Sequence, residues 1–344
     1  MSTHMNDKVA QAIAQHLGKT TPAKDVAKAA VVRPVLAPED GQLMYSNVFG
    51  YKPSFGDFPV DVLGTLPDNI ARLVPQVDGD YVMQKEVAAL LVAGIQDGDK
   101  TLLTGPTGSG KSSLVKYVCA KLNRPFIRIN MSGDVESASL FGTLTVAGGA
   151  TVWEDGAVTE AAKYGAVCLV DEWELMPSEI AMGMQNLLED DGYLYLKEKP
   201  GNSDDRTVIP HKDFRLVFAG NTVGQGDTTG AFSGVGVQNT ATIDRFTNTL
   251  HLDYLTSAHE VNIITSKTSI DAATAQKMVR LATLVRNAYG FGKIGLTISP
   301  RTLINWARKM SRYDAQGAFK VAYAAKLNLD DERTAMELYT KCFG

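Results

Sequence analysis

The chain has few cysteines, no long hydrophobic run and no excess of basic charge. Its three cysteines, Cys119, Cys168 and Cys342, are far apart and form no C-x-x-C pair, so neither a zinc site nor a disulfide framework is indicated. No apolar run approaches the ~20 residues of a membrane-spanning helix, and the first residues lack the apolar core of a signal peptide. A formal net charge of -4 disfavours a nucleic-acid-binding protein. These absences predict a cytoplasmic protein.

Several catalytic motifs are also absent. No H-E-x-x-H and no G-x-S-x-G occurs, so zinc peptidases and serine hydrolases have no support. The Asn-Lys-x-Asp motif with which GTPases recognise the base is missing as well. The sequence D-T-T-G at 227–230 resembles a GTPase motif, but no predicted strand precedes it.

The most informative stretch is 105–112, G-P-T-G-S-G-K-S, which matches the phosphate-binding pattern G-x-x-x-x-G-K-[ST]. In this pattern backbone N–H groups surround phosphate oxygens, Lys111 contacts the β and γ phosphates, and the Ser112 hydroxyl ligates Mg²⁺. An apolar strand at 101–104 and an amphipathic helix at 113–122 flank it, which places the phosphates at a helix N-terminus. The predicted nucleotide-binding residues are Gly105, Pro106, Thr107, Gly108, Ser109, Gly110, Lys111, Ser112 and Ser113.

Polar residues follow two further predicted strands. Asp171 and Glu172 come directly after the apolar segment 166–170, where α/β folds place their ligands. We expect Asp171 to hold Mg²⁺ through water and Glu172 to orient and deprotonate the attacking water. Asn221 follows the segment 215–219 closely and is placed to hold the same water near the γ phosphate.

Two arginines are candidates for contacts with phosphate. Ser299 is a good N-cap and Pro300 suits the first helical position, so Arg301 would begin a helix from which it reaches phosphate. Arg245 lies in the run D-R-F at 244–246. Taken alone, each arginine would be interpreted as a surface charge.

The order of predicted elements divides the chain into three parts. Residues 1–40 contain one amphipathic segment at 6–18, then become Ala-, Lys- and Pro-rich, which predicts a loosely ordered arm. Residues 41–255 alternate strands and helices, which predicts an α/β domain, a parallel sheet covered on both faces. Helical periodicity predicts a small all-helical domain at 256–344. The predicted strands are 101–104, 126–130, 166–170, 215–219 and 249–253, and the predicted C-terminal helices are 272–289, 301–311, 317–327 and 332–343.

Together these motifs resemble those of the AAA+ ATPases. The stretch 105–112 is similar to the Walker A motif, Asp171 and Glu172 to Walker B, Asn221 to sensor 1, Arg245 to the arginine finger and Arg301 to sensor 2. Within the superfamily the chain resembles the MoxR branch, and more specifically the CobS type, the ATPase subunit of aerobic cobaltochelatase. The similarity is clear in 219–230, 243–246 and 299–307, and it covers most of the chain beyond residues 1–40.

This resemblance implies a P-loop AAA+ core, an αβα sandwich, with a helical lid, and ATP and Mg²⁺ as cofactors. It also implies a hexameric ring that binds ATP between subunits, in which Arg245 acts on the γ phosphate of the neighbouring subunit. Arg301 would respond to the nucleotide of its own subunit. Two β-hairpin inserts, at 141–158 and 193–211, would line the ring or face a partner. The partner implied is a von Willebrand A-type, CobT-like protein.

The sequence is compatible with three functions. The first is ATP-driven remodelling of a partner protein, as a cobaltochelatase subunit or as a MoxR-type chaperone for metal-cofactor insertion. The second is a nucleic-acid-directed motor, which the negative charge disfavours although Lys197, Lys199 and Arg206 offer a basic hairpin. The third is a ring with a purely structural ATP site, which the complete set of catalytic candidates disfavours. Because the chain has no tetrapyrrole-sized motif, any chelation chemistry is predicted to belong to a partner.

Overall fold

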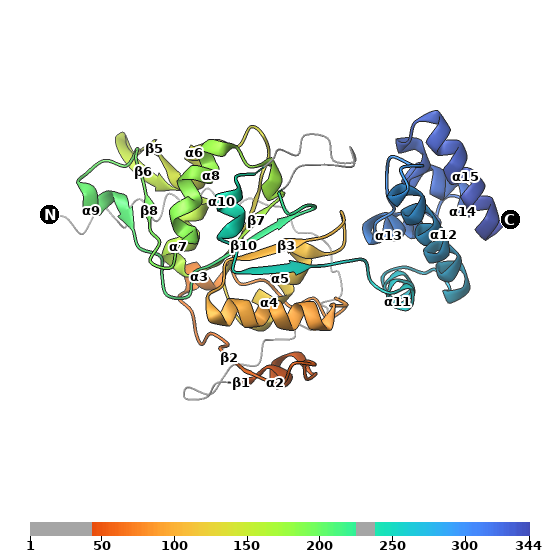
Figure 1. The fold of residues 1–344 in the computed structure, drawn as a ribbon, viewed down its shortest axis with the longest axis horizontal. Helices are drawn as coiled ribbons and strands as arrows, with labels where there is room; N and C mark the ends of the chain where they lie inside the picture. The colour runs from red at the N-terminus through yellow and green to blue at the C-terminus, as the bar shows by residue number, and fades with distance from the viewer. Residues whose placement is uncertain (1–42, 225–237) are drawn as a thin grey trace. The chain divides into compact units, whose positions relative to one another are not determined.

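The computed structural model describes residues 43–224 and 238–344, and its centre is a five-stranded parallel sheet (Figure 1). The strand order is β11–β3–β10–β7–β4, and each neighbouring pair is parallel. The strands are β3 (Thr101–Thr104), β4 (Phe126–Asn130), β7 (Val167–Asp171), β10 (Arg215–Gly220) and β11 (Asn248–His251). The predicted parallel-sheet α/β fold is therefore confirmed.

Helices cover both faces of this sheet, with α4 and α5 on one side and α7, α8 and α10 on the other (Figure 1). Successive strand residues alternate between two cores, because side chains of a strand point to opposite faces. Leu103 and Leu169 pack with α4 and α5, whereas Leu102 and Val170 pack with α7 and α8. The covering helices are α4 (Lys85–Asp97), α5 (Lys111–Lys121), α7 (Ala157–Tyr164), α8 (Ser178–Met184) and α10 (Thr240–Asp244).

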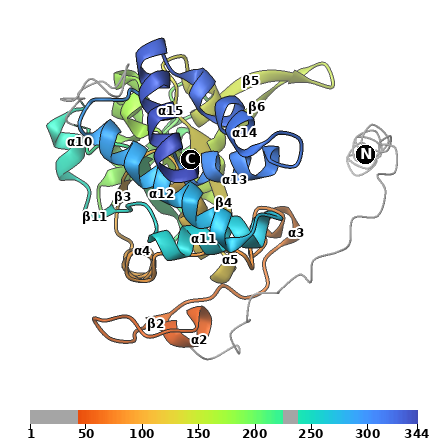
Figure 2. The same ribbon diagram turned by 90° about the vertical axis from the view of Figure 1, so that its right-hand side faces the viewer.

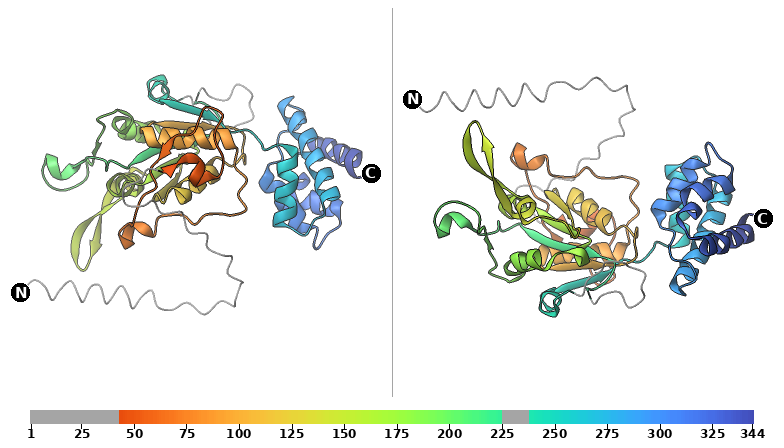
Figure 3. Two further views of the ribbon diagram at one scale, coloured as in Figure 1. Left: turned by 90° about the horizontal axis from the view of Figure 1, so that it is seen from below. Right: turned by 90° about the horizontal axis from the view of Figure 1, so that it is seen from above.

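Two antiparallel hairpins lie outside the sheet, as the sequence predicted for both segments. The ribbon of β5 and β6 stands away from the sheet (Figure 3), and β8 pairs with β9. The second hairpin carries a short helix, α9, at its tip, because Asn202 caps it by accepting from the Asp205 N–H at 3.0 Å. The hairpin elements are β5 (Gly142–Ala147), β6 (Ala150–Asp155), β8 (Leu194–Tyr195), α9 (Ser203–Arg206) and β9 (Thr207–Val208).

After β11 the chain is helical, and α11 to α15 share one hydrophobic core (Figure 2). Trp306 is buried in that core, and its indole N–H donates to the Ala315 carbonyl at 3.0 Å. The helices are α11 (Ser257–Lys267), α12 (Ala272–Gly290), α13 (Pro300–Lys309), α14 (Ala315–Ala322) and α15 (Leu329–Phe343).

The remaining elements are short and connect these layers. They are β1 (Leu43–Met44), α2 (Tyr45–Phe49), β2 (Pro59–Val60), α3 (Asp68–Ala71) and α6 (Ser137–Phe141), with 3-10 turns at Trp173–Leu175, Gln185–Leu188 and Ala324–Lys326. No helix within 43–224 and 238–344 is long and apolar enough to cross a membrane.

Several predicted boundaries need correction. The strand predicted at 166–170 begins and ends one residue later, because Asp171 pairs in the sheet with Asn130 and Ala219. The strand predicted at 249–253 is Asn248–His251, and the helix predicted at 317–327 breaks at Tyr323, whose backbone leaves the helical region. The segment 6–18, the arm at 1–40 and the sequence at 227–230 lie outside the described residues.

Candidate active site

A cavity of about 620 Å³ opens at the carboxyl ends of β3, β7 and β10. Most of the predicted site residues line it, although they come from four separate parts of the chain. The predicted residues in its wall are Thr107, Gly108, Ser109, Gly110, Lys111, Ser112, Ser113, Asp171, Glu172, Asn221 and Arg301. Gly105, Pro106 and Arg245 are not part of this wall.

The glycines of the loop before α5 are required by its shape. Gly105, Gly108 and Gly110 have φ angles of 144°, 76° and 99°, a region that side chains disfavour. A Cβ added to Gly105 would lie 2.0 Å from the carbonyl oxygen of Leu252. The pattern of glycines therefore has a steric cause, and it brings the loop N–H groups to the start of α5.

Lys111 is held inside this loop by three oxygen atoms. Its Nζ donates to the carbonyls of Gly105 at 2.6 Å and Pro106 at 3.2 Å, and to Asn221 Oδ1 at 3.2 Å. Its side chain is buried, and burial lowers the pKa of the ammonium group. The cation is thus positioned at the cavity wall together with Asn221, the amide predicted to hold the attacking water near the γ phosphate.

Asp171 is the acceptor for three donors. Ser112 Oγ donates to its Oδ2 at 2.5 Å, and Arg128 Nη2 lies 2.6 Å from the same oxygen. The Glu172 N–H contacts Oδ1 at 3.2 Å. The two residues predicted as magnesium ligands, Ser112 and Asp171, are therefore in direct contact.

Glu172 has a strained backbone and a perturbed carboxyl group. Its φ of 55° places it in the left-handed region, which a non-glycine residue seldom adopts and which is common at functional sites. Burial, followed by the charges of Glu174 and Asp171, raises the pKa of its carboxyl group. Asn221 Nδ2 donates to Glu172 Oε2 at 3.4 Å. A carboxylate with a raised pKa, beside a positioned amide, is suited to act as a general base.

Comparison with known proteins assigns the chain to a family. Residues 100–246 match the family described as AAA domain (dynein-related subfamily), and residues 260–340 match CbbQ/NirQ/NorQ C-terminal. The chain is 33% identical over 281 residues to aerobic cobaltochelatase subunit CobS of Sinorhizobium sp., covering 79% of this chain and 83% of that protein. The chain belongs to the MoxR branch of the AAA+ ATPases, in the CobS type.

Two shorter similarities accompany this match. Protein NorQ of Paracoccus denitrificans is 34% identical over 110 residues, which are 32% of this chain and 41% of NorQ. Mouse von Willebrand factor A domain-containing protein 8 is 33% identical over 135 residues, which are 37% of this chain and 7% of that protein. Family membership makes this chain a nucleotide-binding ATP hydrolase with the P-loop AAA+ fold.

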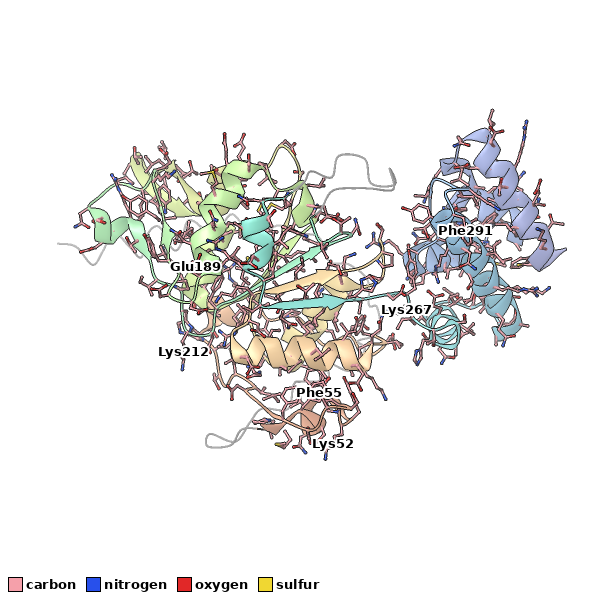
Figure 4. All side chains as sticks on the ribbon, in the orientation of Figure 1. Lys52, Phe55, Glu189, Lys212, Lys267 and Phe291 are labelled. Atoms are coloured by element: carbon pink, nitrogen blue, oxygen red, sulfur yellow. The ribbon has the colours of Figure 1, made fainter. Side chains whose placement is uncertain are left out.

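Arg245 is not among the residues that line the cavity. It follows α10, its Nε contacts Glu189 Oε1 at 2.6 Å, and its Nη1 donates to the Ala241 carbonyl at 2.7 Å. Glu189, labelled in Figure 4, is half exposed, and the Arg245 side chain is 29% exposed. The structure therefore does not bring Arg245 together with the other predicted site residues of the same chain.

The residues before α13 are tied to the phosphate-binding loop. Ser299 accepts from the Thr302 N–H at 3.2 Å, which caps α13 as predicted and begins the helix next to Arg301. Tyr254 donates to the Thr107 carbonyl at 3.0 Å, and its ring stacks 3.9 Å from the Arg286 guanidinium. Arg286 in turn donates to the Ile298 carbonyl at 2.8 Å, directly before Ser299.

Sequence reasoning missed several residues of the cavity. Arg128 and Asn130 lie on the edge strand β4, where their alternation with apolar residues resembled an ordinary exposed strand face. An apolar part of the wall comes from several segments of the chain. Only Pro300 and Ile304 lie in a stretch that the sequence singled out, and the other residues come together with them only in the folded structure. This apolar part contains Tyr81, Val82, Leu255, Ile263, Pro300 and Ile304.

Glu174 is a further residue that the motifs did not indicate. Its carboxylate is 1% exposed, and its Oε1 accepts from the Asn221 N–H at 2.5 Å. Gly220 leaves room for this contact, since a Cβ there would lie 2.0 Å from Glu174 Oε2. Glu174 thus fixes the backbone from which Asn221 reaches the cavity.

Proposed function

We propose that this ATPase assembles into a ring and uses ATP hydrolysis to remodel a partner protein. The observation that carries the proposal is the single cavity in which Lys111, Ser112, Asp171, Glu172 and Asn221 meet. In this assignment Lys111 binds the β and γ phosphates, Asn221 positions the attacking water, and Glu172 accepts its proton. The apolar part of the wall would receive the adenine base, and Arg301 the phosphates.

The oxygen atoms of Ser112 and Asp171 fit a magnesium ion that is held together with the nucleotide. Within the described residues, no group of three His, Cys, Asp or Glu side chains is arranged as a metal cage. Mg²⁺ often binds through one or two protein oxygens plus phosphates, and Ser112 and Asp171 offer this set. The ion supplies charge neutralisation at the β and γ phosphates.

The domain division predicted from the sequence is part of this proposal. It assigns 1–40 to an arm, 41–255 to the nucleotide-binding domain and 256–344 to a helical lid. The end of the strands at β11 and the separate helical core after it support the last boundary.

The ring is proposed because Arg245 has no role in its own cavity. An exposed ion pair contributes only about 0–1 kcal/mol, so the Arg245 guanidinium can exchange its contacts with Glu189 and the Ala241 carbonyl for a contact with a neighbouring subunit. An arginine supplied in trans stabilises the charge that develops on the transferred phosphoryl group. In a hexamer each active site would then combine residues of two subunits.

Arg245→Ala should lose roughly 10³-fold or more in turnover while each subunit still binds ATP. Mixing Arg245→Ala subunits with Glu172→Gln subunits should restore activity, because an intact Glu172 then meets an intact Arg245 at some interfaces. The measurement is steady-state ATPase activity at several mixing ratios, with ring assembly verified by native mass spectrometry.

Glu189→Gln is the matched control for this experiment. It removes the partner of Arg245 and keeps the guanidinium, so turnover should stay within about two-fold of the parent, as for a weak exposed pair. If no mixing ratio restores activity in assembled rings, Arg245 does not act in trans.

The partner is proposed to be a protein with a von Willebrand A-type domain. A stretch similar to this chain occurs in the mouse protein that is named for such a domain, which supports a pairing of the two kinds of domain. The two hairpins offer contact sites outside the ATP cavity, and exposed apolar side chains such as Val146 and Ile209 lie on them or beside them. Cobaltochelatase activity, as in CobS, would then require the partner's own tetrapyrrole chemistry.

Deleting residues 197–206 should separate hydrolysis from partner action. The deletion removes the tip of the second hairpin and keeps the buried Leu196. None of the deleted residues lines the ATP cavity. Basal ATPase activity should stay within about two-fold, whereas nucleotide-dependent binding of a von Willebrand A-type partner should be lost. Pull-down with ATP, ADP and no nucleotide measures the binding.

Lys212→Ala, at the exposed Lys212 of Figure 4, serves as control because it lies outside the deleted segment. Cobalt insertion by the purified chain alone would contradict the remodelling proposal. Strong stimulation of ATPase activity by DNA would instead favour a nucleic-acid motor.

A further inference from the structure

Arg128 occupies a defined place beside the carboxylate that is proposed to hold magnesium. It lies on β4, an edge strand, two residues before Asn130, which pairs in register with Asp171. The guanidinium therefore extends along the strand toward the carboxyl end of the sheet, and its Nη2 reaches Asp171 Oδ2 at 2.6 Å. Among the described residues, Asp171 is the one carboxylate in ion-pair contact with Arg128.

Three donors occupy acceptor positions of Asp171 in this arrangement, and two of them share Oδ2. Oδ2 receives both the Ser112 hydroxyl and the Arg128 guanidinium, while Oδ1 faces the Glu172 N–H. The carboxylate is only 4% exposed, so the charge of Arg128 is its direct compensation in a poorly hydrated place. A metal-bound water at Oδ2 would need the position that Arg128 Nη2 holds.

The two partners differ in how firmly they are fixed. Asp171 is buried, whereas the Arg128 side chain is 50% exposed and lines the same cavity. A half-exposed guanidinium on a flexible stem can leave the carboxylate without being buried unpaired. Asp171 cannot follow it, because its backbone is paired in the sheet on both sides.

We propose that Arg128 competes with the magnesium ion for Asp171 and is displaced when magnesium nucleotide binds. This inference rests on the proposed nucleotide site. Arg128 is in this scheme a positioning residue: it holds Asp171 in contact with Ser112 and sets how much metal is needed for tight nucleotide binding.

The test compares nucleotide affinity with and without metal. The probe is a fluorescent, non-hydrolysable ATP analogue, titrated against the full chain in excess EDTA and in saturating Mg²⁺. The metal gain is the affinity in saturating Mg²⁺ divided by the affinity in excess EDTA. For Arg128→Met and Arg128→Gln the metal gain should rise about five-fold or more over the wild type, because no cation must be displaced.

Arg72→Met is the matched control, since Arg72 is an exposed arginine outside the cavity, and it should leave the gain unchanged. In an Asp171→Asn background, Arg128→Met should change the gain by less than about two-fold, because the competition needs the carboxylate. Thermal unfolding of each variant verifies that it is folded.

An unchanged gain in both folded Arg128 variants would overturn the proposal, because a merely structural role weakens both affinities equally. The same rise in the Asp171→Asn background would overturn it as well. If the wild type binds no nucleotide under either condition, the proposed nucleotide site itself has failed, which is a different result.

Discussion

Replacing Lys111 with alanine is expected to remove nucleotide binding, with a loss of roughly 10²–10⁴-fold in affinity for two charge-assisted hydrogen bonds. The ammonium group lies at the cavity wall, and the Gly105 and Pro106 carbonyls aim it there. Alanine offers neither the charge nor the donors. Isothermal titration with a non-hydrolysable ATP analogue measures the loss.

Lys116→Ala is the control for this experiment. Lys116 lies on the same helix, α5, but is exposed and outside the cavity. The affinity of the Lys116→Ala variant for the ATP analogue should therefore equal that of the parent. If Lys111→Ala binds ATP as tightly as the parent, the assignment of the phosphate site is wrong.

Glu172→Gln should retain ATP binding and lose about 10²–10⁴-fold in turnover, because an amide cannot accept the proton of the attacking water. The direction of its pKa shift adds a pH prediction. A raised pKa means that the carboxylate becomes protonated at a higher pH than an ordinary glutamate, so turnover should begin to fall early as pH decreases. Steady-state ATPase assays over pH, together with binding measurements, separate the two effects.

Glu179→Gln is the matched control, since Glu179 is an exposed glutamate in the first turn of α8. It should keep both parental turnover and the parental pH profile. Parental hydrolysis by Glu172→Gln would exclude Glu172 as the base.

The strands illustrate which parts of the fold follow from the sequence. The segments at 101–104 and 126–130 were predicted with the bounds that β3 and β4 have, because turn residues and the phosphate-binding loop limit them on either side. Strand β7 begins and ends one residue later than predicted, because an aspartate at the end of a strand adds nothing to its apolar pattern. Helix α11 was not predicted, because one of its two buried residues is the charged Glu260, paired with Arg286 at 2.8 Å.

The sequence by itself determined the phosphate-binding loop, because the loop needs glycines at its positive φ angles and Lys111 and Ser112 follow at fixed positions. It also placed Asp171 and Glu172 at a strand end, which in a parallel sheet is the ligand edge. Only the tertiary structure decided that Arg128 contacts Asp171 and that Arg245 turns to Glu189 instead of the cavity. These contacts join residues 43 and 56 positions apart in the chain (171 − 128 and 245 − 189), and no local pattern or period of a helix or strand encodes such a meeting.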